Sequence, residues 1–150
     1  MSPITRQNLS SAIAELLPRI IQGVQLEFLV KRTITYTQFL ILVAIHSLKS
    51  CPMSVLAKSM HVSMPTISGI VDRLVQGGYV KRAQSLKDRR QVMIELSYKG
   101  EMLIVQFQGV VGQRWNEVLK NLSSKDVESF FKIIQKLQSE LKNQNANFKK

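Results

Sequence analysis

Three cations and one acid stand together near the middle of the chain, as Lys87, Asp88, Arg89 and Arg90. Cations this close together favour an anionic partner, and arginine also suits a narrow DNA minor groove, in which negative potential is concentrated. One arginine could enter such a groove while its neighbour contacts phosphate, and Asp88 could orient the Arg90 guanidinium through a charge-assisted hydrogen bond. A solvated loop would have the same composition, so the neighbouring elements must decide.

The charged segment is predicted to be the tip of a β-hairpin behind a helix-turn-helix. Val92, Ile94 and Leu96 alternate with Gln91, Met93, Glu95 and Ser97, which is the period of a half-buried strand, and residues 80–84 are a plausible partner strand. Upstream, a short helix over 54–60, a turn at 61–63 and a second helix form a helix-turn-helix pattern. A charged hairpin in this place is a wing, which favours DNA binding over a helical hairpin in a bundle.

The second helix of this pattern has a clear beginning and end. Ser63 is a good N-cap, Pro65 fits the first turn, and Gly77 with Gly78 tolerates the left-handed backbone that ends a helix. The inward face is predicted to hold Ile67, Ile70, Val71 and Leu74. The outward face, which would meet DNA, is predicted to hold Met64, Thr66, Ser68, Gly69 and Arg73. Hydroxyls can bind bases or phosphates, glycine permits close approach, and arginine suits phosphate or guanine.

Long helices are predicted at both ends of the chain. In the first, Pro18 interrupts an apolar stripe, so the helix either kinks there or begins near it. A capping box of Thr35 and Gln38 opens the next helix, and Ser97 can cap a long helix after the hairpin. That helix has too many apolar positions for one stripe, so we expect it to be buried on more than one side. Ser123, with Asp126 three residues on, opens the last helix.

These elements predict a mainly α fold with a small β-hairpin wing, as one domain over residues 1–150. The winged helix-turn-helix lobe covers residues 35–97, and residues 8–32 and 98–144 form helical dimerisation regions. The terminal helices have more apolar surface than the small lobe can cover. A second copy is the simplest cover, so we expect a homodimer.

The composition agrees with a nucleic-acid partner. The 150 residues include 21 Lys and Arg against 10 Asp and Glu, a net charge of +11. Such an excess favours a polyanionic partner and salt-sensitive association. Cys51 is the single cysteine, so nothing suggests an oxidising compartment. No signal peptide is visible and the longest apolar run, residues 39–45, is too short to span a membrane, so we expect a cytoplasmic protein.

The hairpin and helix together resemble a known family. Asp88 and Arg90, then Leu96, Ser97 and Gly100, resemble the wing signature Asp-x-Arg-x5-Leu-Thr-x-x-Gly of the MarR (multiple antibiotic resistance regulator) family. Similar residues occur upstream at 37–39, 56–57, 63, 68, 71–74 and 78–82. The resemblance implies a winged-helix homodimer on a pseudo-palindromic operator, with Arg90 in the minor groove and Asp88 supporting it; Arg89 and Lys87 are then left for phosphates. Ser97 replaces the usual threonine, and the tip has no glycine.

Members of this family are often switched by small aromatic anions, by thiol oxidation or by metals. An anionic effector could lie between the dimer helices and the lobe, near Arg19, Tyr36, His46 or Trp115, although Tyr36 could equally belong to the core and Arg19 to the surface. We interpret Cys51 as structural rather than as a sensor, because nothing nearby in the sequence lowers its pKa. Two scattered histidines do not make a metal site, and we expect neither metal nor cofactor.

Two alternatives to a sequence-specific repressor stay open. The chain could be a non-specific DNA-binding architectural protein that uses the fold for its charge, or a redox-sensing regulator that works through Cys51. An enzyme is the third class, and the sequence contains no nucleophile and base set, paired acids or phosphate-cradling loop. We therefore expect a DNA-binding regulator without enzymatic activity.

Overall fold

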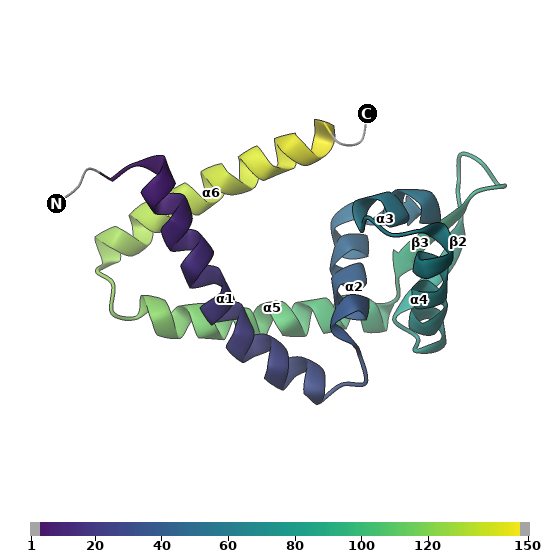
Figure 1. The fold of residues 1–150 in the computed structure, drawn as a ribbon, viewed down its shortest axis with the longest axis horizontal. Helices are drawn as coiled ribbons and strands as arrows, with labels where there is room; N and C mark the ends of the chain where they lie inside the picture. Colours follow the sequence, from purple (N-terminus) through teal and green to yellow (C-terminus); the bar gives the residue numbers. More distant parts are fainter. Residues whose placement is uncertain (1–3, 148–150) are drawn as a thin grey trace. The chain divides into compact units, whose positions relative to one another are not determined.

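The computed structural model describes residues 4–147, with side chains for all of these except 23–27, 30 and 144–147. The elements follow the chain in the order α1 (Arg6–Val30), α2 (Tyr36–Leu48), β1 (Ser50–Pro52), α3 (Met53–Ser59), α4 (Met64–Gln76), β2 (Val80–Gln84), β3 (Val92–Leu96), α5 (Tyr98–Leu119) and α6 (Ser124–Asn147) (Figure 1). The chain forms two compact units, divided after Gly112. The mainly helical fold with a small wing is confirmed.

Local sequence signals set the boundaries of the helices in the first unit. At the start of α2, the Gln38 amide donates to Thr35 Oγ1 at 3.3 Å, and the Thr35 amide donates to Gln38 Oε1 at 2.9 Å, which is the predicted capping box. The Thr66 amide donates to Ser63 Oγ at 3.3 Å and caps α4. Gly78, with φ of 75°, takes the left-handed conformation after α4, whereas Gly77 remains right-handed.

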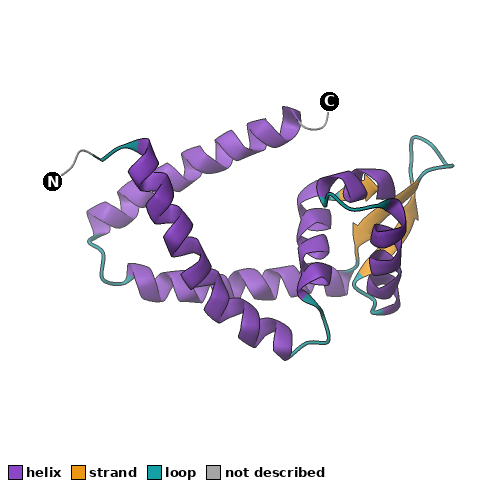
Figure 2. Ribbon diagram, viewed as in Figure 1, coloured by secondary structure: helices purple, strands orange, loops and turns teal. Residues whose placement is uncertain are grey.

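The sheet has three antiparallel strands in the order β1-β3-β2 (Figure 2). The two predicted strands pair from Val80 opposite Leu96 to Gln84 opposite Val92. β1 pairs with the other edge of β3 and places Cys51 opposite Ile94. This third strand was not predicted, because three residues that end in proline give no local signal of a strand.

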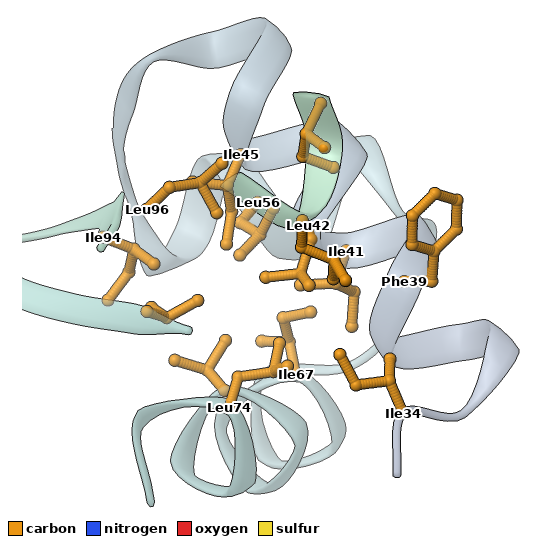
Figure 3. Close-up of a cluster of buried hydrophobic side chains, with 14 of the residues drawn as sticks. Ile34, Phe39, Ile41, Leu42, Ile45, Leu56, Ile67, Leu74, Ile94 and Leu96 are labelled. Atoms are coloured by element: carbon orange, nitrogen blue, oxygen red, sulfur yellow. The ribbon is translucent and has the colours of Figure 1, made fainter. Parts of the chain in front are cut away.

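One apolar core holds the helix-turn-helix against the sheet (Figure 3). α4 contributes Ile67, Val71 and Leu74, each at most 1% exposed, and β3 contributes Ile94 at 0%. A fully buried aliphatic side chain contributes about 1.5–3 kcal/mol, so packing rather than helix propensity fixes the orientation of α4. Ile70, predicted to lie inside, is only half-buried and packs at the border of the core.

α5 begins in close contact with the end of α4. The Gly100 amide donates to Ser97 Oγ at 3.1 Å, so Ser97 caps the helix as predicted, and the same hydroxyl donates to the Gly78 carbonyl. The Tyr79 carbonyl accepts from the Ser97 amide at 3.0 Å. A Cβ on Gly100 would lie 2.2 Å from that carbonyl oxygen, so only glycine fits there.

The long helices differ from two expectations. α1 begins at Arg6, capped by Thr5, and continues through Pro18, so a start near Pro18 is wrong. In α5 the buried residues are Gly100, Leu103 and Ile104, whereas Val105, Val110 and Val118 are 53%, 38% and 46% exposed. Burial of α5 on more than one side is therefore wrong for a single chain. Among the described residues no helix has the length and apolar character needed to cross a membrane.

Candidate nucleic-acid interface

The second helix of the helix-turn-helix presents a polar face to solvent. Ile67, Val71 and Leu74 point into the core, and this leaves the opposite side of α4 uncovered. Of the five residues predicted on that side, Ser68 is half-buried, and the exposed ones are Met64, Thr66, Gly69 and Arg73. The Thr66 hydroxyl lies 2.8 Å from Ser63 Oγ, so the N-cap holds it at the first turn of the helix. The arrangement suits contacts to a ligand that lies along the first three turns of α4.

Gly69 lies inside α4 with open space around it. A Cβ built at this position would meet nothing within 4 Å. Glycine in a helix interior costs about 1 kcal/mol relative to alanine. No neighbour among the described residues would clash with a side chain at position 69. The glycine therefore costs stability in the free protein without a packing reason.

The loop between β2 and β3 projects away from α3 and α4 (Figure 1). Ser85 closes it, since the Ser85 amide donates to the Gln91 carbonyl at 3.0 Å and Ser85 Oγ accepts from the Lys87 amide at 3.2 Å. The Asp88 carbonyl also accepts from the Gln91 amide at 2.9 Å. These hydrogen bonds form a serine-capped turn, so the tip reverses the chain direction without a glycine.

Asp88 orients Arg90 through the backbone. Its Oδ1 accepts from the Arg90 amide at 2.9 Å, and within residues 4–147 it forms no ion pair. The predicted contact between the Asp88 carboxylate and the Arg90 guanidinium is therefore wrong. A carboxylate two residues upstream reaches the backbone amide more readily than the end of a long side chain, as Asx turns do. The guanidinium of Arg90 is left to point outward.

Ion pairs occupy the cations at the base of the wing and spare those at its tip. Arg82 Nη2 lies 2.5 Å from Asp72 Oδ1, which joins β2 to α4, and Lys81 Nζ lies 3.3 Å from Glu95 Oε2 on the paired strand. Lys87, Arg89 and Arg90 are exposed and have no ion-pair partner in the described part of the chain. Arg82 and Asp72 are among the residues of the family resemblance, but sequence analysis assigned them no role. Their role here is to fix the wing beside α4.

The four predicted effector residues are not gathered into one site by the structure of the first unit. Arg19 is exposed on α1, and Tyr36, 51% exposed, begins α2. His46 lies ten residues further on, about 15 Å along the helix, where its Nδ1 is 3.0 Å from Glu101 Oε2. Trp115 belongs to the second unit, with its ring centroid 6.2 Å from that of Phe130.

A hollow of about 120 Å³ in the first unit is lined by none of these four residues. Lys99 lines it; its Nζ lies 4.2 Å above the Tyr79 ring and donates to the Gly77 carbonyl at 2.7 Å. The full lining is Thr33, Ile34, Gln38, Arg73, Leu74, Gly77, Tyr79 and Lys99. Cys51 lies elsewhere, in β1, and is 3% exposed. Because a sensor thiol needs access to its oxidant, this burial favours a structural role for Cys51.

A helix-turn-helix whose outward face lies beside a cationic hairpin defines the winged helix-turn-helix class of proteins. A model of the MarR family matches residues 34–92. The structure of the reduced form of MarR from E. coli is 28% identical with a TM-score of 0.59, and the match covers 91% of this chain and 98% of that one. The lobe over residues 34–92 is thus similar to the MarR family, and the Multiple Antibiotic Resistance Repressor MarR shares the fold at 26% identity with a TM-score of 0.65.

Two further structures share the fold at lower identity. The transcriptional regulator Tm0710 from Thermotoga maritima is 22% identical with a TM-score of 0.77, and the match covers 97% of this chain and 99% of that one. A mutant of MepR from S. aureus, bound to an oligodeoxyribonucleotide, is 20% identical with a TM-score of 0.63 over 93% and 99% of the two chains. The fold shared with these two structures therefore covers nearly the whole chain, beyond the residues matched by the family model.

Proposed function

We propose that the chain is a sequence-specific repressor that binds a pseudo-palindromic operator as a homodimer. The observation that carries the proposal is the group of exposed cations at the wing tip, Lys87, Arg89 and Arg90, which have no ion-pair partner among the described residues. α4 would lie in a major groove and the wing tip in the adjacent minor groove. The MepR mutant bound to an oligodeoxyribonucleotide, a protein of the same fold, supports this assignment.

The homodimer is supported by apolar side chains that one chain leaves exposed. On α1 these include Leu9, Ile13 and Leu16, at 54%, 41% and 43%. On α6, Phe131 and Leu141 are both 60% exposed. Monomeric proteins rarely expose this much apolar surface on long helices, and a second copy would cover it. A small aromatic or anionic effector that releases the DNA completes the proposal, with Arg19, Tyr36, His46 and Trp115 as its candidate contacts.

Selection of DNA sites from a random duplex library tests the proposal directly. We expect an inverted repeat whose half-sites lie about one helical turn apart, because a two-fold protein presents two copies of α4. The selected duplex should bind at least about 10³-fold more tightly than bulk DNA at moderate salt. Equal binding to both would favour the alternative of a non-specific architectural protein.

Gly69→Ala is expected to have opposite effects on stability and on DNA binding. The free protein should gain about 1 kcal/mol, since alanine favours the helix and its Cβ meets nothing within 4 Å. Affinity for the selected duplex should fall, because the new methyl group stands on the face that approaches DNA. Urea denaturation and a gel-shift titration measure the two effects. An increase in stability without any loss of affinity would remove Gly69 from the interface.

A further inference from the structure

The wing tip carries an apolar side chain among its cations. Leu86 is 105% exposed, the highest value among the exposed large apolar side chains of the described residues, ahead of Ile4 at 83%. It lies beyond the end of β2, next to Lys87, in the loop that joins β2 to β3. A single exposed leucine is ordinary on a protein surface, so its position in the tip is what matters.

The tip is built so that Leu86 stays outside. Ser85 Oγ accepts from the amides of Lys87 and Asp88, at 3.2 and 3.3 Å, and so turns the backbone around Leu86. The bonds between Ser85, Asp88 and Gln91 close the loop on both sides. The leucine therefore stands on a hydrogen-bonded turn and is fully exposed there.

A partner for this tip needs negative charge and apolar surface within a few ångströms of each other. The DNA minor groove offers both, because phosphates line its edges, sugar rings form its walls, and apolar base faces become accessible where a base step opens. DNA-binding proteins insert leucine and similar side chains between base steps there, which partly unstacks and bends the duplex. An acidic protein surface would match the cations but would leave the leucine without an apolar contact.

We propose that Leu86 is an apolar wedge that enters the minor groove together with the wing arginines and selects a deformable base step. The proposal rests on the proposed function of sequence-specific DNA binding. The wedge predicts a preference for particular base steps under the wing that arginine alone would not produce. Arginine favours stiff, narrow A-tracts, whereas a wedge favours TA or CA steps, which unstack easily.

Two duplexes that differ only under the wing test the wedge. Both contain the half-sites selected by the wild-type protein, and one has TA steps at the wing positions while the other has A-tracts. We expect the wild type to prefer the TA duplex by about 10-fold, and Leu86→Ala to reduce this preference below about 2-fold, in the range of a single altered base pair. With 2-aminopurine at the step, binding of the wild type should raise fluorescence by unstacking, and binding of Leu86→Ala should not.

Leu86→Met is the matched control, because it keeps an apolar side chain of similar length and should keep the preference. The slope of affinity against salt should be the same for Leu86→Ala and the wild type, since leucine neutralises no phosphate. If Leu86→Ala retains the wild-type preference and the fluorescence change, the wedge is overturned while specific binding stands. If the wild type selects no common site, the proposed function fails first and the wedge fails with it.

Discussion

Gly100→Ala is expected to destabilise the protein by about 3 kcal/mol or more, at the upper end of the cost of overpacking a core. A Cβ at this position would lie 2.2 Å from the Tyr79 carbonyl oxygen and 3.3 Å from Leu96 Cδ2. The carbonyl cannot retreat freely, because it accepts the Ser97 amide at 3.0 Å. Relief of the clash would therefore move β2 away from α5.

The measurement is the urea midpoint at a fixed protomer concentration, because the stability of the proposed dimer would depend on concentration. Gly109→Ala is the matched control in the same helix: its Cβ would meet nothing within 4 Å, and it should stabilise the chain by up to about 1 kcal/mol. A variant that fails to fold agrees with the prediction in direction. Wild-type stability of Gly100→Ala would show that α5 does not pack against Tyr79 in this way.

Local signals were enough to predict the helix-turn-helix and both long strands. The capping residues Thr35 and Ser63 mark where helices begin, because their side chains satisfy amides that a helix leaves unpaired. The alternation in 92–96 predicted β3, and the partner strand was predicted with the bounds that β2 has. These features depend on residues that are neighbours in the sequence.

The features that the sequence did not predict depend on distant partners. β1 exists because Ser50, Cys51 and Pro52 pair with residues 93–95, more than forty positions away. The burial of α5 depends on which of its turns the lobe reaches, and apolar composition alone does not give that. The Asp88 contact was predicted with the wrong group of Arg90, because the sequence spacing allowed both a backbone and a side-chain hydrogen bond. In each case the three-dimensional contacts decided between arrangements that the sequence pattern allowed equally.

Arg90→Ala is expected to reduce affinity for the selected operator by roughly 30-fold, equivalent to about 2 kcal/mol for a specific arginine contact. The stability of the free protein should change by less than about 0.5 kcal/mol, because the side chain is exposed and has no ion-pair partner among the described residues. The separation of these two effects is what makes the variant informative. Gel-shift titration and urea denaturation of the same preparation measure both.

Two comparisons identify the kind of contact that Arg90 makes. Lys125→Ala on α6 removes the same charge from an exposed position outside the winged helix-turn-helix and should leave affinity nearly unchanged. Arg90→Lys keeps the charge but not the planar guanidinium. It should bind like the wild type if Arg90 contacts a phosphate, and should recover only part of the lost affinity if Arg90 lies inside the minor groove. Loss of the Arg90 charge should also lower the salt slope by about 1 for each wing bound. If Arg90→Ala binds the operator like the wild type at moderate salt, the wing does not enter the groove through this residue, and α4 must supply the specificity alone.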